Sequence, residues 1–139
     1  MYYARSADGA RSFDAAVPLG VADFSKPAHV QLALDGTETV VAAWDDGRER
    51  LPRVMMRVSR DGGASFGPEV IASAGDAAAT FPVIAVSRDT VTVGWAERAR
   101  ADHEQSERGM GDMKDPKMQM PLISVGAQQI IVRRGLLIS

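Results

Sequence analysis

The chain has 139 residues, of which 45% are hydrophobic and 24% charged, a balance typical of a folded globular protein rather than a disordered one. Its net charge of −2 gives no electrostatic attraction to nucleic acid or to an anionic membrane, and we expect neither as a partner. The absence of cysteine excludes disulfides and thiolate chemistry, and no apolar run is long enough to span a bilayer.

A strand-like segment opens the chain and leads directly into a turn. Residues 2–5 and 13–18 are predicted to be the outer pair of strands in a four-stranded unit. Between them lies the first turn, Ser6-Ala7-Asp8-Gly9-Ala10-Arg11-Ser12-Phe13, built from residue types that form tight turns. Residues 1–5 lack the apolar core of a signal peptide. Because the first strand looks entered halfway, we expect the chain to be the C-terminal piece of a longer protein.

A hairpin is predicted after a linker at residues 20–27. Val30–Leu34 and Thr39–Trp44 are joined across Asp35-Gly36-Thr37, in which the Asp-Gly dipeptide is a hairpin signal. Three residues of the second strand alternate onto one face: Val40, Ala42 and Trp44.

Two further strands flank a second turn. Residues 45–50 are predicted to be a loop closed by Pro52, and residues 53–58 and 68–72 to be strands. The second turn between them is Ser59-Arg60-Asp61-Gly62-Gly63-Ala64-Ser65-Phe66. In this turn the two glycines allow positive φ, Asp61 can accept bonds from backbone N–H groups, and Phe66 can anchor the turn on a core.

The second turn has the pattern serine, any residue, aspartate, any residue, glycine, two further residues and an aromatic residue. This is the pattern of the Asp-box, or bacterial neuraminidase repeat, and the chain therefore resembles the sialidase-like β-propellers. The first turn has the same serine, aspartate and aromatic residue 53 positions earlier. It departs at Ala10, where the pattern has glycine, so we expect a strained or differently shaped turn there.

The hairpin pattern recurs as well. Small residues at 73–80 are predicted to connect to a second hairpin, formed by Pro82–Val86 and Thr90–Trp95. Trp44 and Trp95 lie 51 positions apart. Self-similarity at about 50 residues indicates propeller blades or a related array.

After Glu97 the strand pattern breaks. Residues 98–122 are polar, charged and rich in methionine, which predicts a long insertion with a short helix at 99–108. Residues 128–134 then resume a β-branched strand, predicted to be the third strand of the last unit.

Together these patterns predict an all-β fold, a partial β-propeller of four-stranded antiparallel blades. The chain is expected to form one partial propeller domain of about two and a third blades. Its parts are an outer half-blade at 1–19, a full blade at 29–72, and a last blade at 81–139 that carries the insertion. Trp44 and Trp95 are expected to fill equivalent positions between the sheets.

The resemblance implies a non-catalytic segment of a sialidase-like propeller, serving as a scaffold or a glycan-facing surface. It also implies a secreted or periplasmic protein, whose partners are carbohydrate and either the rest of a longer propeller or another copy of itself. We expect no cofactor. In this family the Asp-box turns lie on the outer rim, away from the active site. Their residues are therefore expected to be structural: Ser6, Asp8, Phe13, Ser59, Asp61, Gly63 and Phe66.

The alternative is a fragment of an exo-α-sialidase, a glycosidase. Such enzymes bind the substrate carboxylate with three arginines and use a tyrosine–glutamate pair as nucleophile and an aspartate as acid and base. The family's arginine-isoleucine-proline motif is absent, and Tyr2 and Tyr3 are predicted in an outer strand, so the catalytic residues stay unassigned. Residues of suitable type are Arg48, Arg50, Arg53, Arg133, Arg134, Asp45, Asp46 and Glu97.

A third hypothesis is copper binding by the methionine-rich loop, because thioethers are soft ligands that select Cu(I). The candidate ligands are Met110, Met113, Met118 and Met120, with His103 nearby. The opposing interpretation is a loop whose methionines cover part of the fold. His29 precedes a strand and is expected to be structural.

Overall fold

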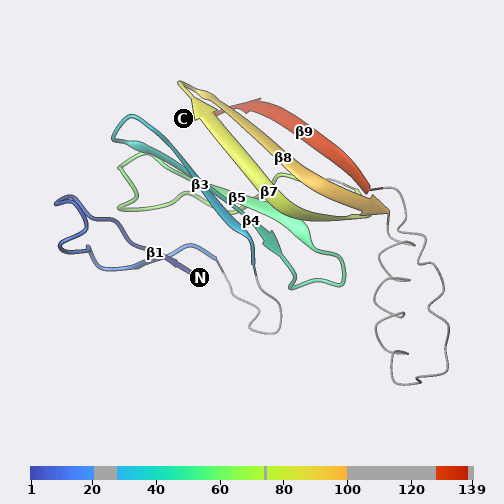
Figure 1. Ribbon diagram of the computed structural model, residues 1–139, viewed down its shortest axis with the longest axis horizontal. Coiled ribbons are helices and arrows are strands. Elements are labelled where there is room, and N and C mark those ends of the chain that lie inside the picture. Colours follow the sequence, from blue (N-terminus) through green and yellow to red (C-terminus); the bar gives the residue numbers. More distant parts are fainter. Residues whose placement is uncertain (21–27, 74, 100–127, 138–139) are drawn as a thin grey trace, which may run out of the picture.

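The computed structural model describes residues 1–20, 28–73, 75–99 and 128–137, which contain β-strands and no helix (Figure 1). The prediction of an all-β fold is confirmed. The strands are β1 (Tyr2–Tyr3), β2 (Val17–Pro18), β3 (Val30–Asp35), β4 (Thr39–Asp46), β5 (Arg53–Ser59), β6 (Val70–Ile71), β7 (Ala77–Ser87), β8 (Thr90–Ala99) and β9 (Gln128–Leu136). Over these ranges no segment could cross a membrane as a long apolar helix.

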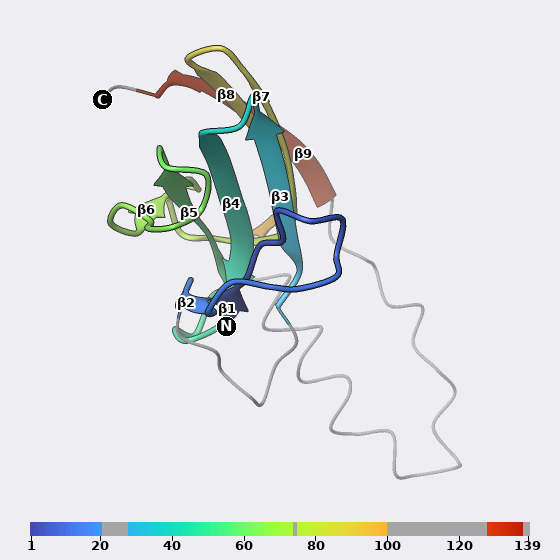
Figure 2. The ribbon, with the colours of Figure 1, turned by 90° about the vertical axis from the view of Figure 1, so that its left-hand side faces the viewer.

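The strands form three antiparallel sheets. The first sheet is β1–β2, the second is β3–β4–β5–β6, and the third is β7–β8–β9. Strand β7 contacts β3, β4 and β5, so the third sheet packs against one face of the second. The first sheet lies against the opposite face (Figures 1 and 2).

Both predicted hairpins are present. Strands β3 and β4 pair from Val30 to Asp35 across a three-residue loop, whereas β7 and β8 are joined by the two residues 88–89. The second loop is one residue shorter than the first. The first strands of the two hairpins therefore repeat at 52 positions, whereas the second strands, with the tryptophans, repeat at 51. The hairpins therefore differ mainly in the loop.

The two tryptophans are the largest buried side chains, with exposed fractions of 1% for Trp44 and 2% for Trp95. Trp44 packs in a cluster with Leu19, which follows the first sheet. Trp95 packs in a cluster with Val54 of the second sheet. Each tryptophan thus fills the space between its own sheet and the preceding one, as the repeat predicted.

Several predicted boundaries were wrong. The loop predicted at 45–50 begins only after Asp46, because Asp45 and Asp46 still pair with β5. The connection predicted at 73–80 ends early, since Ala77–Thr80 pair with the end of β8 and a bulge follows before Val83. The strands predicted at 2–5, 13–18 and 68–72 are reduced to the two-residue strands β1, β2 and β6.

The predicted insertion begins two residues late, because Arg98 and Ala99 belong to β8. The rest of that segment, with its predicted helix, lies outside the described residues. Strand β9 pairs with β8 along its whole length, which confirms a third strand after the insertion and extends it to Leu136.

Apolar side chains are left exposed on the second sheet. Leu32 and Leu34 of β3 have exposed fractions of 46% and 63%. Their repeat equivalents in β7, Ile84 and Val86, are half-buried against the second sheet. The difference arises because the first sheet has two strands and covers β4 and β5 but not β3.

The outer face of the third sheet is exposed in the same way. Pairing of Trp44 with Met55 and of Trp95 with Ile131 aligns β5 with β9. Val54 of β5 is fully buried against the third sheet, whereas its equivalent in β9, Ile130, is 73% exposed. The second and third sheets therefore each present an apolar face on the same side. The third sheet covers this face of the second sheet, whereas the equivalent face of the third sheet is exposed.

Candidate functional site

The second turn, Ser59–Phe66, is held by the side chains of its own serine and aspartate. Ser59 Oγ accepts a bond from Gly63 N at 2.8 Å and donates to Asp61 Oδ1 at 2.7 Å. Asp61 then accepts from Ser65, at 2.9 Å from its backbone N and 2.5 Å from its Oγ. These bonds satisfy backbone N–H groups that a tight reversal leaves without partners.

The first turn, Ser6–Phe13, repeats this pattern. Ser6 Oγ accepts from Ala10 N at 2.9 Å and donates to Asp8 Oδ1 at 2.8 Å. Asp8 accepts from Ser12, at 2.9 Å from its backbone N and 2.7 Å from its Oγ. The two turns are therefore the same structure built twice.

Ala10 occupies the position of Gly63, and both have positive φ, 65° and 88°. The expected change of shape at Ala10 is thus not found, since the hydrogen bonds are the same. Alanine here adopts a left-handed conformation that its Cβ disfavours. The departure from the pattern is accommodated as backbone strain.

Hydrogen bonding lowers the pKa of both turn carboxylates. The Oγ and backbone N–H of Ser12, followed by Ser6, lower the pKa of Asp8 to about 2. Ser65 in the same manner, followed by Ser59, lowers the pKa of Asp61 to about 2. Carboxylates that accept several bonds within one turn act as turn-stabilising groups, and they stay ionised at neutral pH.

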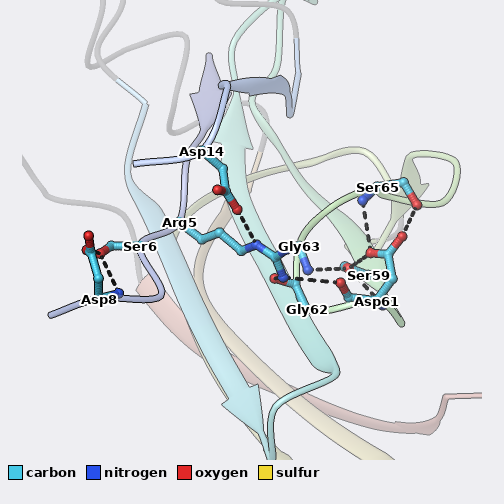
Figure 3. A network of polar contacts seen from close by, with 9 residues as sticks. All are labelled: Arg5, Ser6, Asp8, Asp14, Ser59, Asp61, Gly62, Gly63 and Ser65. Carbon is cyan, nitrogen blue, oxygen red and sulfur yellow. Dashed lines mark hydrogen bonds and ion pairs between the residues drawn. The ribbon is translucent and has the colours of Figure 1, made fainter. Parts of the chain in front are cut away.

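The second turn is also held from outside by the segment before the first turn (Figure 3). Arg5 donates from Nη1 to the carbonyl oxygen of Gly62 at 3.1 Å, and its Nε lies 2.7 Å from Asp14 Oδ2. The Tyr3 ring meets the Phe66 ring edge-on, with centroids 5.2 Å apart. Phe66 is thereby half-buried, whereas Phe13 of the first turn is 62% exposed.

The opposite end of β4 and β5 carries the other polar groups of the second sheet. Asp45 is buried and accepts from His29 through its backbone N and its Nδ1, both at 2.7 Å. It also accepts from Phe81 N at 3.0 Å, in the bulge of β7. The His29 and Phe81 rings are in contact, with centroids 4.2 Å apart and planes tilted by 41°. Asp45 thus joins the second and third sheets, and the structural role expected for His29 agrees with these contacts.

Asp46 points to the other face and enters a network of ion pairs. Its Oδ2 lies 2.7 Å from Arg48 Nη2, which lies 3.0 Å from Glu69 Oε2. Asp46, followed by Glu69, raises the pKa of Arg48 above its ordinary value. Arg53 and Glu49 form a separate ion pair at 2.9 Å. At this end of the sheet each of these two guanidiniums is therefore paired with at least one carboxylate.

A cavity of about 340 Å³ opens beside this network. It is lined by Asp46, Arg48, Glu49, Arg53, Met55 and Ile71. Its volume is at the lower end of the range for small-molecule sites, roughly 300–1,000 Å³. We call this cavity the β4–β5 pocket.

The acidic residue two positions after each tryptophan is used differently in the two repeats. Glu97 Oε2 accepts a bond from Trp95 Nε1 at 3.0 Å. Asp46 has a side chain one methylene shorter and is paired with Arg48, and Trp44 Nε1 is buried without an acceptor among the described residues. At the pocket, the acidic group is thus turned away from the indole and toward an arginine.

The other candidate residues do not converge on one place. Arg133 lies over the Trp95 ring at 5.7 Å, and Arg134 is on the exposed face of β9. Arg50 is exposed in the loop between β4 and β5. In the described ranges no three His, Asp or Glu side chains form a metal-binding group. The methionines proposed as copper ligands and His103 lie outside the described residues.

The sequence did not indicate the clamping arginines. Arg57 donates to four carbonyl oxygens, those of Gly67, Phe66, Pro18 and Leu19, at 2.6–3.1 Å. It joins the second sheet to the end of the first, as Arg5 does from the other side. The position of Arg57 between Met56 and Val58 in β5 was the available signal, since a charged residue flanked by apolar ones in a central strand needs buried partners.

Comparisons of this chain with protein-family models, with curated proteins and with solved structures give no match. Any function therefore has to be inferred from the turns, the sheets and the pocket themselves.

Proposed function

We propose that this chain is a section of a sialidase-like Asp-box β-propeller that provides a scaffold and a glycan-facing surface, without a complete active site of its own. The observation that carries the proposal is the repeated turn. Asp8 and Asp61 accept the same hydrogen bonds at the same places in successive sheets. The same turn in two successive sheets, within a stack of sheets packed face to face, supports an array of propeller blades.

The uncovered faces support the same proposal. The third sheet buries Val54 of the second sheet, yet the equivalent Ile130 is exposed on its own outer face. Leu32 and Leu34 are exposed at the other end of the stack. In a propeller, each of these faces packs against a further blade. We infer that further sheets of the same type, or a second copy of this chain, cover them.

The absence of catalysis is inferred from how the charged groups are used. A retaining sialidase needs an arginine cluster, a nucleophile pair and an acid that converge on one pocket. Here Arg48 is bound to Asp46 and Glu69, and Arg57 to backbone carbonyls. The ring of Tyr3 is packed against Phe66. Charged groups committed to structural contacts in this way are poorly placed to bind a substrate carboxylate.

Hydrolysis of a fluorogenic sialoside by the purified chain tests this proposal. We expect no turnover above that of buffer. Turnover that persists through purification and disappears in Asp46→Asn or Glu97→Gln would overturn the proposal and favour the exo-α-sialidase alternative. Arg134→Gln, on the exposed face of β9, is the control for these variants.

A further inference from the structure

We propose that the β4–β5 pocket binds a neutral saccharide unit. This inference rests on the proposed function, because it assigns the glycan-facing role to one place and one class of ligand. The pocket lies at the start of β5, whereas the second turn follows the end of β5, so the two are at opposite ends of the same strand. Binding at the pocket would leave the turn contacts undisturbed.

The charges around the pocket favour a neutral ligand over an acidic one. Its lining contains two arginines and two carboxylates, and each arginine is already paired, Arg48 with Asp46 and Arg53 with Glu49. Glu69 adds a further carboxylate beside Arg48. An anionic ligand would have to displace one of these partners and would meet the remaining negative charge.

The same groups suit hydroxyl groups. A guanidinium has five N–H donors, and a carboxylate has acceptor sites beyond a single ion pair, so paired side chains keep donors and acceptors for a ligand. The ion pairs also hold Arg48 and Arg53 in place, which lowers the entropy lost when a ligand binds. Met55 and Ile71 line the same cavity and offer apolar contact. Donors, acceptors and an apolar surface together match a sugar ring, which has hydroxyl edges and C–H faces.

The contrast between the two repeats indicates that this place is specialised. In the third sheet the acidic residue satisfies the indole N–H of its tryptophan. In the second sheet, Asp46 is directed to Arg48 at the pocket and Trp44 Nε1 lacks that acceptor. Among the described residues the indole N–H of Trp44 thus lacks the acceptor that its repeat equivalent has, and the acidic group faces the pocket instead.

Saturation-transfer NMR on the full 139-residue chain tests the proposal. The probes are the methyl glycosides of glucose, galactose, mannose and N-acetylglucosamine, with the methyl glycoside of N-acetylneuraminic acid as the acidic comparison. We expect saturation of the ring protons of at least one neutral glycoside, and at least tenfold weaker binding of the acidic one. Arg53→Gln and Glu49→Gln should each weaken the neutral glycoside at least tenfold, whereas Arg134→Gln should not.

Absence of transfer to every neutral glycoside would overturn the proposal, as would preference for the acidic glycoside or equal binding by all the variants. Circular dichroism of each variant checks that it folds, and Arg53 and Glu49 are exposed enough for substitution to be tolerated. If a variant does not fold, titration of the wild-type chain with the glycosides still tests the proposal. If no neutral glycoside binds and the sialoside is not hydrolysed, only the saccharide site is rejected. If the sialoside is hydrolysed, the proposed function is rejected.

Discussion

The ring of Tyr3 stands where a side chain on Gly63 would have to lie. A Cβ built on Gly63 falls 2.7 Å from both Cζ and Oη of Tyr3. The glycine of the second turn is therefore required twice, once for its φ of 88° and once for its contact with the first sheet. The pattern in the sequence indicates the first requirement only.

Gly63→Ala is expected to destabilise the fold by at least about 2 kcal/mol, because it adds both strain and overlap. The matched change is Ala10→Gly in the first turn, which relieves strain at φ 65° and is expected to stabilise by about 1 kcal/mol. Equilibrium denaturation of both variants measures the two effects. Equal changes of the same sign would show that the turns are not equivalent.

Ser59 and Ser6 provide a second matched pair. Ser59 is buried, and its Oγ accepts from the buried Gly63 N–H, so Ser59→Ala is expected to cost about 1–3 kcal/mol. Ser6→Ala removes the same bond at an exposed place, where water replaces the hydroxyl, and is expected to cost less. Denaturation midpoints compare the two. A larger loss for Ser6→Ala would contradict the assignment of the second turn as the more buried one.

The turn carboxylates predict how stability depends on pH. The pKa values of Asp8 and Asp61 are lowered from 3.8 to about 2 in the folded chain. Between these values the unfolded chain binds more protons, so stability falls as the pH is lowered from about 4 to about 2. Above pH 4 these two groups contribute a constant amount. Melting temperatures measured over this range check the prediction, and Asp8→Asn with Asp61→Asn should flatten the dependence.

The sequence predicted the hairpins, the two turns and the burial of both tryptophans, because each depends on local pattern. Alternation placed Trp44 on one face, and the serine, aspartate and glycine types specified the turn. What it did not predict depends on contacts between segments distant in the chain. Strand β7 begins at Ala77 because Ala77–Thr80 find partners in β8, and a run of small residues gives no sign of this.

The pocket was missed for a similar reason. Asp46 and Arg48 were recognised as charged residues in a loop, but Asp46 belongs to β4, and the second carboxylate paired with Arg48, Glu69, comes from beyond the second turn. A comparison of the two repeats contained a signal, because aspartate lies two positions after Trp44 and glutamate two positions after Trp95. Only the coordinates show that the shorter side chain is paired with arginine instead of the indole.

Asp46→Glu tests this difference directly. The longer side chain is expected to reach Trp44 Nε1 as Glu97 reaches Trp95, and to add about 1 kcal/mol of stability through the new hydrogen bond. It should at the same time weaken binding of the neutral glycoside, because Arg48 loses one of its two carboxylate partners at the pocket. Denaturation and saturation transfer on the same sample give both values. A variant that binds as well as the wild type would separate Asp46 from the site.

Self-association is expected for the isolated chain, since apolar faces at both ends of the stack are uncovered. Val132 and Ile130 are exposed side by side on β9, and exposed faces of this kind promote association. Replacing both by lysine is expected to weaken association at least tenfold, because two charges would have to be desolvated on contact. Sedimentation velocity over a range of concentrations measures this.

Val70→Lys is the control for the lysine pair, because Val70 is half-exposed on the edge strand β6, away from the outer face of the third sheet. Its association should equal that of the wild type. If the wild-type chain sediments as a monomer and unfolds in one cooperative step, the exposed apolar faces do not cause self-association. The proposal of a propeller section would then lose its support from packing, and the repeated turns would describe a self-sufficient stack of three sheets.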